Sequence, residues 1–312
     1  MNEVSRKILE QVNSVIIGKE AVTEKVLMAV LAQGHVLLED VPGVGKTTMA
    51  LAFARTLGLD SRRVQFTSDT MPSDIIGFSL YNKETGRFDY KSGAVMTNLL
   101  LADEINRTSS KTQSALLEAM EEYQVTVDGH TYPLPKPFVV LATQNPVGSA
   151  GTQLLPSSQL DRFMIRTTMG YPDRQSQVDI LRERHHENPL DRLQGVVTCE
   201  ELLELIESAK QVHIADAVYD YIVDLVDATR SSELVELGVS PRGALALCRM
   251  AKAHAFVQGG DFVTPEDVYQ VFDDVCAHRL VLSAKARLGK ITAREITEQL
   301  RQQVPVPQVA QL

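Results

Sequence analysis

Three features are scarce or missing in this sequence of 312 residues: paired cysteines, a long apolar run and an excess of basic charge. Its three cysteines, Cys199, Cys248 and Cys276, show neither CxxC spacing nor a Cys/His pattern typical of metal ligands, so we interpret them as reduced core residues. No apolar run reaches the ~18 residues that a membrane-spanning helix needs. The first residues, MNEVSRKILEQV, form an amphipathic pattern rather than a signal peptide. These absences predict a cytoplasmic protein without direct membrane insertion.

Basic residues are outnumbered, because 31 lysines and arginines face 40 acidic residues and give a formal net charge of −9. This balance argues against a surface built throughout to neutralise nucleic-acid phosphates, although it leaves room for a local basic pore. With 44% hydrophobic and 23% charged residues, the composition is that of a soluble globular protein of about two domains.

Short apolar runs alternate with helical patterns as far as about residue 190. Five of them are predicted strands, and they read HVLL from His35, RVQF from Arg63, NLLLAD from Asn98, FVVLAT from Phe138 and FMIRTT from Phe163. Buried strands separated by helices predict an α/β fold with a five-stranded, mostly parallel sheet sandwiched by helices. Beyond NPLDRLQG the pattern is purely helical. We therefore predict an α/β domain over residues 1–188, a small all-α domain over 189–303 and a flexible tail over 304–312.

A phosphate-binding loop is indicated by EDVPGVGKTT, residues 39–48, although the first glycine of the usual G-x-x-x-x-G-K-[ST] pattern is replaced by Asp40. Glycines let backbone N–H groups converge on phosphates, the lysine reaches the outer phosphates, and the next hydroxyl binds Mg²⁺. Aspartate enters the left-handed conformation readily and bonds local backbone, so Asp40 can make the turn with its carboxylate directed away from the phosphates. The predicted nucleotide-binding residues are Pro42, Gly43, Val44, Gly45, Lys46, Thr47 and Thr48.

Polar side chains end two further predicted strands. Asp103 and Glu104 follow NLLLA, where one carboxylate can hold Mg²⁺ together with Thr47 while Glu104 orients and polarises an attacking water. Asn145 follows FVVLATQ at the same edge of a parallel sheet, which places its amide near the γ-phosphate. The alternatives are an acidic strand end that faces solvent and an asparagine that forms a turn before proline. The combination with a phosphate loop favours an ATP hydrolase.

These stretches together resemble the MoxR family of AAA+ ATPases. The resemblance rests, in chain order across residues 15–247, on VIIGKE, EDVPGVGKTT, LLLADEINR, LATQNP, LPSSQLDRF and SPRGALAL. It implies an AAA+ P-loop domain with a helical lid, ATP or ADP and Mg²⁺ at subunit boundaries, and a homo-hexameric ring. By resemblance, Ile17 and Gly18 border the adenine, Asn145 is sensor 1, Arg162 is the arginine finger and Arg242 is sensor 2. Whether Arg242 acts within its own subunit or on a neighbour stays open.

Two inserts narrow the resemblance to a branch that MoxR proteins share with magnesium chelatase ATPase subunits and replicative helicases. The turn NKETG predicts a hairpin within residues 74–95, and Asp128-Gly129 predicts a second hairpin within 123–134. In that branch the inserts project toward the pore or face of the ring. The second hairpin region is net acidic and the first has one excess positive charge, so we expect a protein client and no nucleic-acid partner.

The resemblance implies an ATP-hydrolysing, chaperone-like remodeller, since family members commonly act with von Willebrand factor A domain proteins on maturation of protein complexes or metal insertion. Three alternatives stay open: a magnesium chelatase-like motor subunit, a nucleic-acid translocase, and a nucleotide-gated binding scaffold with little turnover.

Overall fold

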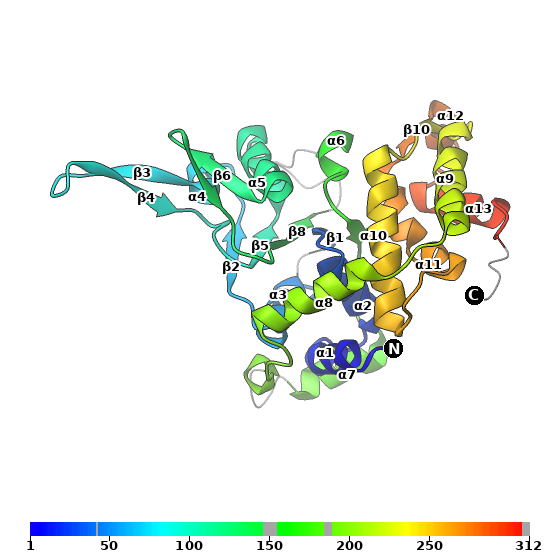
Figure 1. The fold of residues 1–312 in the computed structure, drawn as a ribbon, viewed down its shortest axis with the longest axis horizontal. Helices are drawn as coiled ribbons and strands as arrows, with labels where there is room; N and C mark the ends of the chain where they lie inside the picture. Colours follow the sequence, from blue (N-terminus) through cyan, green and yellow to red (C-terminus); the bar gives the residue numbers. More distant parts are fainter. Residues whose placement is uncertain (42, 146–154, 184–188, 308–312) are drawn as a thin grey trace.

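The computed structural model describes residues 1–41, 43–145, 155–183 and 189–307. Its centre is a sheet of five parallel strands in the order β2-β5-β8-β1-β9 (Figure 1). The strands are β1 (Val36–Glu39), β2 (Ser61–Gln65), β5 (Leu99–Asp103), β8 (Val139–Gln144) and β9 (Ile165–Thr167). Each overlaps one of the predicted apolar runs, so the prediction of a five-stranded parallel sheet is confirmed.

Both faces of the sheet are covered, because successive strand residues point to opposite sides. Leu38, Leu101 and Leu141 belong to one buried cluster, which also contains side chains of α1 (Glu3–Asn13), α2 (Glu20–Leu31) and α3 (Lys46–Thr56). Leu100 and Val140 belong to a second cluster with side chains of α4 (Pro72–Ile76) and α5 (Ser110–Glu122). This alternation explains why the strands read as continuous apolar runs in the sequence.

Two hairpins extend from the sheet region on the left of Figure 1. They are β3 (Gly77–Asn82) with β4 (Arg87–Ser92), and β6 (Gln124–Val127) with β7 (His130–Pro133), both antiparallel. Asp128 and Gly129 have positive φ at the tight turn between β6 and β7. The predicted hairpins are therefore confirmed. Tyr90 and Tyr132 stack with ring centroids 4.0 Å apart, so the two hairpins contact each other.

A group of helices lies on the right of Figure 1 and contacts the sheet-bearing part through α2 and β9. It consists of α9 (Asp216–Ser231), α10 (Pro241–Gln258), α11 (Pro265–Cys276), α12 (Ala284–Leu288) and α13 (Ala293–Gln303), with the short strands β10 (Val235–Leu237) and β11 (Val281–Leu282). Thr264 caps α11, and Pro265 opens it. Lys25 of α2 forms an ion pair of 2.7 Å with buried Asp274 of α11, which links the two parts.

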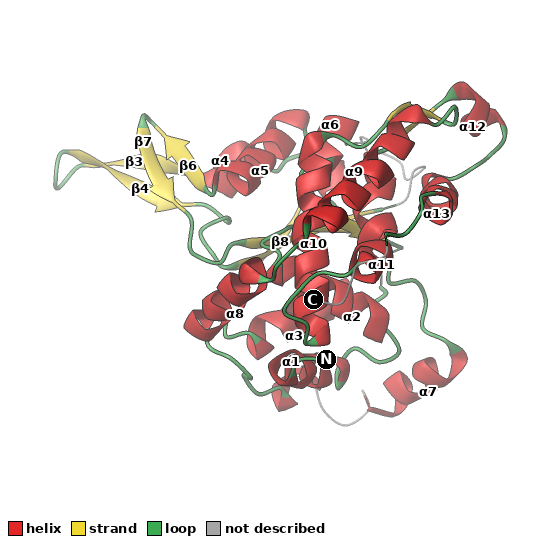
Figure 2. Ribbon diagram, turned by 45° about the vertical axis from the view of Figure 1, so that its right-hand side comes forward, coloured by secondary structure: helices red, strands yellow, loops and turns green. Residues whose placement is uncertain are grey.

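α6 (Ser157–Leu160) lies between β8 and β9 along the chain, whereas α7 (Arg174–Glu183) and α8 (Cys199–Gln211) lie between β9 and the helical group. Figure 2 places α7 at the lower edge of the molecule, away from the helices of the other part. None of the helices within the described ranges is both long and apolar enough to cross a bilayer.

Candidate functional site

The ends of β2 and β5 and the loop after β1 line one cavity of about 640 Å³. Asn145, which follows β8, is not among its described lining residues but donates a hydrogen bond to Glu104. β8 is hydrogen-bonded between β5 and β1, so the chain segments that follow these strands meet at the same edge of the sheet. The cavity is lined by Gly43, Val44, Gly45, Lys46, Thr47, Thr48, Arg63, Gln65, Asp103, Glu104, Tyr171, Pro172, Gln177, Ile180 and Leu181. The predicted nucleotide-binding residues from Gly43 to Thr48 thus lie beside both predicted acidic residues. Pro42 lies outside the described residues.

The phosphate loop has the backbone that its glycines allow. Gly43 has φ 86° and Gly45 has φ 98°, a left-handed region that side chains with a Cβ rarely adopt. Gly45 caps α3, so the helix begins with Lys46 at the cavity wall. Lys46 Nζ donates hydrogen bonds to the carbonyl oxygens of Asp40 at 2.9 Å and Val41 at 3.2 Å. A helix N-terminus that follows such a loop suits a phosphate group.

Asp40 makes the strand-to-loop turn in a way that differs from the sequence prediction. It is not among the described non-glycine residues with positive φ, so the expected left-handed turn is wrong. Its carboxylate accepts hydrogen bonds from the backbone N–H groups of Met169 and Gly170, and the second bond measures 3.0 Å. The expectation of local backbone bonds is therefore also wrong, because the partners are 129 and 130 positions away along the chain.

Asp103 is a buried carboxylate at the end of β5. Its Oδ1 accepts a hydrogen bond of 2.6 Å from the Thr143 hydroxyl, and its Oδ2 accepts one of 2.8 Å from Arg63. Thr47 lines the same cavity with a half-buried side chain. A carboxylate and a hydroxyl beside a phosphate loop are the oxygen ligands that Mg²⁺ takes in nucleotide sites, so these residues fit the predicted metal.

Glu104 is held by three side chains. Its Oε2 accepts hydrogen bonds of 2.8 Å from Arg107 and from Gln65, and its Oε1 accepts one of 2.9 Å from Asn145. Partial burial opposes ionisation, but the bonds from Arg107 and Asn145 outweigh it and hold the pKa of Glu104 below its ordinary value. Glu104 itself has φ 58°. A strained backbone at a site side chain is consistent with a functional residue held in place by its surroundings.

Sequence reasoning missed Arg63 and Gln65 of β2, which line the cavity and bond the two acidic residues. Their signal was available, because both stand in the predicted strand RVQF, next to the strand that ends in Asp103. The missed apolar wall, formed by Tyr171 and Leu181 among others, had no such signal.

Ile17 and Gly18, which the resemblance assigns to the adenine, are absent from the described cavity lining. Gly18 instead lies against α7, because a Cβ placed on it would be 2.2 Å from the Ser176 hydroxyl oxygen. Gln177 and Ile180 of the same helix do line the cavity. Gly18 thus contacts a helix that forms part of this wall, and the contact of Ile17 and Gly18 with adenine stays a prediction.

Arg162 and Arg242 lie together, but not at the cavity of their own phosphate loop. Both line a second cavity of about 460 Å³, along with Arg249 and Arg279. One oxygen of Glu121, Oε2, accepts hydrogen bonds from Arg162 at 3.1 Å and from Arg242 at 2.5 Å. The structure therefore pairs the two predicted arginines on one carboxylate, away from Lys46.

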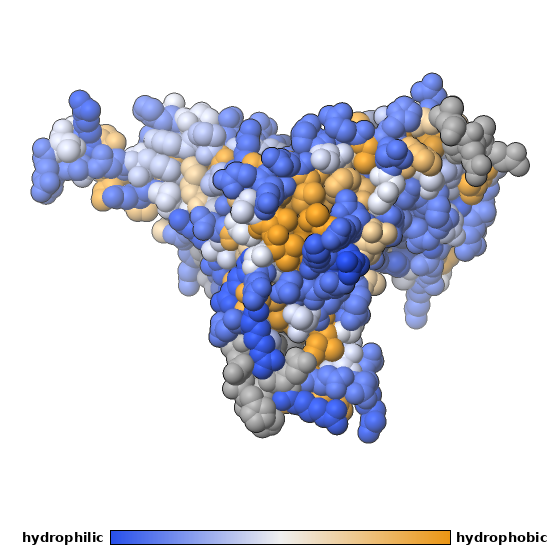
Figure 3. Space-filling model, turned by 60° about the horizontal axis from the view of Figure 1, so that its bottom comes forward, coloured by the Kyte–Doolittle hydropathy of each residue, from blue (hydrophilic) through white to orange (hydrophobic). Residues whose placement is uncertain are grey.

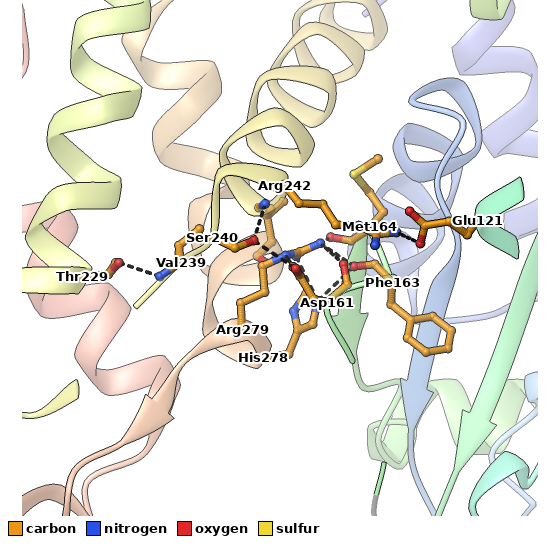
Figure 4. A network of polar contacts seen from close by, with 12 residues as sticks. Glu121, Asp161, Phe163, Met164, Thr229, Val239, Ser240, Arg242, His278 and Arg279 are labelled. Atoms are coloured by element: carbon orange, nitrogen blue, oxygen red, sulfur yellow. Dashed lines mark hydrogen bonds and ion pairs between the residues drawn. The ribbon is translucent and has the colours of Figure 1, made fainter. Parts of the chain in front are cut away.

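Asp161 organises the surroundings of these arginines (Figure 4). Its carboxylate accepts bonds of 2.7 Å from Arg279 and 2.9 Å from the hydroxyl of Ser240, the residue that caps α10 just before Arg242. Gly243 is required by close packing, since a Cβ there would be 2.8 Å from Arg279 Cδ. The start of α10 and the segment that carries Arg162 are therefore joined through one partly buried network.

Comparison with known proteins identifies the family of this chain. A family model described as "ATPase family associated with various cellular activities (AAA)" matches residues 35–165, and an AAA lid domain model matches residues 227–300. The chain is 46% identical to the protein YeaC of Bacillus subtilis, across 96% of this chain and 94% of YeaC.

Two further relatives are the chaperone MoxR1 of Mycobacterium tuberculosis, with 40% identity across 99% of this chain and 84% of MoxR1, and the protein MoxR of Methylorubrum extorquens, with 31% identity across 90% and 88%. A solved structure of a candidate ATPase from Cytophaga hutchinsonii superposes with a TM-score of 0.90 and 39% identity, covering 97% of this chain and 94% of that one. The chain belongs to the MoxR family of AAA+ ATPases.

Proposed function

We propose that the protein uses ATP hydrolysis for chaperone-like remodelling or maturation of protein complexes, with metal insertion as one form of that task. The observation that carries the proposal is that Lys46, Asp103 and Glu104 line one cavity, which gives the ATPase its chemistry. The name of the relative MoxR1, a chaperone, supports the client-directed part. A magnesium chelatase-like motor subunit stays the alternative.

Each polar group has a role that its position supports. The loop N–H groups and Lys46 bind the phosphates, and Glu104 orients and polarises the attacking water. Asn145, which donates to Glu104, helps to place that water. Thr47 and Asp103 would hold Mg²⁺, which would offset negative charge on the phosphates.

The test compares two substitutions at the cavity. Glu104→Gln should retain ATP binding while lowering hydrolysis by about 100-fold or more, because it removes a general base. Lys46→Ala should weaken binding of ATP itself. Glu118→Gln, at an exposed position on α5, is the matched control and should leave both measurements unchanged. Normal hydrolysis by Glu104→Gln would show that Glu104 is not the base.

The assembly that we propose is a homo-hexamer in which Arg162 and Arg242 reach the nucleotide of a neighbouring subunit. Their position in a second cavity, apart from their own phosphate loop, supports action in trans for both. The boundaries of residues 1–188 for the AAA+ domain and 189–303 for the lid belong to the same proposal. So does a partner with a von Willebrand factor A domain, which would contribute the client specificity.

The proposed client is a protein rather than a nucleic acid. The β3–β4 hairpin has exposed apolar side chains, with Phe88 72% and Leu80 52% exposed, and Tyr81 packs edge-on against Phe88. Figure 3 shows such apolar surface next to hydrophilic surface on the arm at its left. A mixed surface of this kind suits contacts to a polypeptide better than a grip on a phosphate backbone.

A further inference from the structure

Asp40, which replaces the first glycine of the usual phosphate loop, contacts the segment that directly precedes another part of the cavity wall. The residue is 6% exposed, and its carboxylate accepts hydrogen bonds from the backbone N–H groups of Met169 and Gly170. Hydrogen bonds from N–H groups to a carboxylate are charge-assisted, and they are stronger than bonds between neutral groups. Asp40 therefore ties the segment after β9 to the end of β1.

The segment that Asp40 holds continues directly into the cavity wall. Tyr171 and Pro172 line the cavity, and α7 adds Leu181 from the same stretch of chain. Tyr171 is 76% and Leu181 63% exposed, so this wall offers aromatic and apolar surface. Such surface suits the base and ribose of a nucleotide, whereas loop N–H groups and a lysine suit its phosphates.

A second side-chain contact also holds the same wall. Lys19 Nζ donates a hydrogen bond of 2.8 Å to the carbonyl oxygen of Tyr171. This contact lies at the surface, where water competes with it, while the Asp40 carboxylate is buried and its bonds are protected. Of these two side-chain contacts, the buried bonds of Asp40 are therefore expected to contribute more to the position of the wall, in addition to the pairing of β9 with β1.

We propose that Asp40 is a positioning residue that holds the base-side wall against the phosphate loop and so determines affinity for the nucleoside part of the nucleotide. The proposal rests on the proposed assignment of Gly43 to Thr48 to the phosphates. It has an unusual consequence: Asp40→Gly, which would restore the usual loop pattern, should impair nucleotide binding.

The test measures dissociation constants for ADP and for inorganic pyrophosphate by calorimetry, with Mg²⁺ present. Asp40→Gly should weaken ADP binding about tenfold, the change that corresponds to losing about one charge-assisted hydrogen bond, and should leave pyrophosphate binding within about twofold. Lys46→Ala is the comparison at the phosphate end and should weaken both ligands. Tyr171→Ala should mimic the selective loss of ADP affinity, and the effect of Asp40→Gly should shrink in a Tyr171→Ala background.

The outcomes separate this proposal from the proposed function. Equal weakening of ADP binding and pyrophosphate binding by Asp40→Gly would mean that Asp40 acts on the phosphate loop alone. Unchanged ADP binding would mean that the hydrogen bonds of Asp40 to Met169 and Gly170 are not needed for affinity. Either result overturns the proposal. If Asp40→Gly shows no cooperative thermal unfolding transition and is therefore not folded, the same comparison of ADP and pyrophosphate is made with Asp40→Asn, which keeps one acceptor oxygen. A wild-type protein that binds neither ligand would instead refute the phosphate-loop assignment itself.

Discussion

At the scale of single residues, His35 shows how burial determines charge. The ring is fully buried at the start of β1; Nδ1 accepts a hydrogen bond from the Val140 N–H, and Nε2 donates to the Met120 carbonyl oxygen, both at 3.0 Å. Burial disfavours the imidazolium and lowers the pKa of His35 to about 4, although the bond to Met120 opposes the shift. Protonation would also remove the acceptor that Val140 uses. The folded protein therefore requires neutral His35.

This requirement predicts a pH-dependent stability. Because the pKa of His35 is lower in the folded than in the unfolded chain, the unfolded state binds a proton first, and stability falls as pH drops from about 6.5 toward about 4. Between pH 7 and pH 5 His35 should account for about 2 kcal/mol of lost stability. We expect His35→Gln to lose correspondingly less than the wild type over that range in urea unfolding. His130→Gln, at an exposed site, is the control, and equal pH dependence of His35→Gln and the wild type would contradict the prediction.

At the scale of elements, local patterns predicted most of the fold. The five strands could be predicted because each is an apolar run buried on both faces, and the strand-end carboxylates Asp103 and Glu104 because parallel strands share an edge. The hydrogen bonds of Asp40 could not be predicted from the sequence, because its partners are determined by how β9 pairs with β1. The pairing of Arg162 and Arg242 on Glu121 could not be predicted either, because the two arginines lie 41 and 121 positions from Glu121 along the chain.

The β3–β4 hairpin carries a prediction about clients. Its basic side chains Lys83, Arg87 and Lys91 are offset by Glu84 and Asp89, and counterion release from so little net charge gives weak DNA binding. We expect neither single- nor double-stranded DNA to raise the ATPase rate at about 0.15 M salt. Tight, salt-sensitive DNA binding that is lost in a Lys83→Ala, Arg87→Ala double variant would favour the translocase alternative.

At the scale of the whole molecule, each subunit would present two different faces to its neighbours. The cavity with Lys46 and Glu104 contains the proposed hydrolytic groups. Arg162 and Arg242 line a different cavity, and among the described residues neither arginine lines the cavity that contains Lys46. A ring of identical subunits can bring one face to the other at every boundary, since head-to-tail contacts close into cyclic assemblies.

Mixing inactive variants tests this arrangement. Arg162→Ala should lower hydrolysis roughly a thousandfold, and Lys46→Ala should abolish it, but an equal mixture should recover about a quarter of the wild-type rate, since about a quarter of boundaries then pair an intact loop with an intact arginine. Subunit exchange is followed by fluorescence energy transfer between labelled proteins. The double variant mixed with either single variant is the control and should not recover. No recovery by the single variants despite exchange would refute action in trans.

The contact between Asp40 and Gly170 also has a consequence in time. The two residues are 130 positions apart, and a ribosome adds about 5–20 residues per second, so the carboxylate is made on the order of ten seconds before the amide that it binds. Met169 and Gly170 follow β9, the strand that completes the sheet. During synthesis, the phosphate loop therefore exists for seconds without its second wall, and nucleotide can stabilise the nascent chain through this wall only after the wall residues as far as Leu181 have left the ribosome.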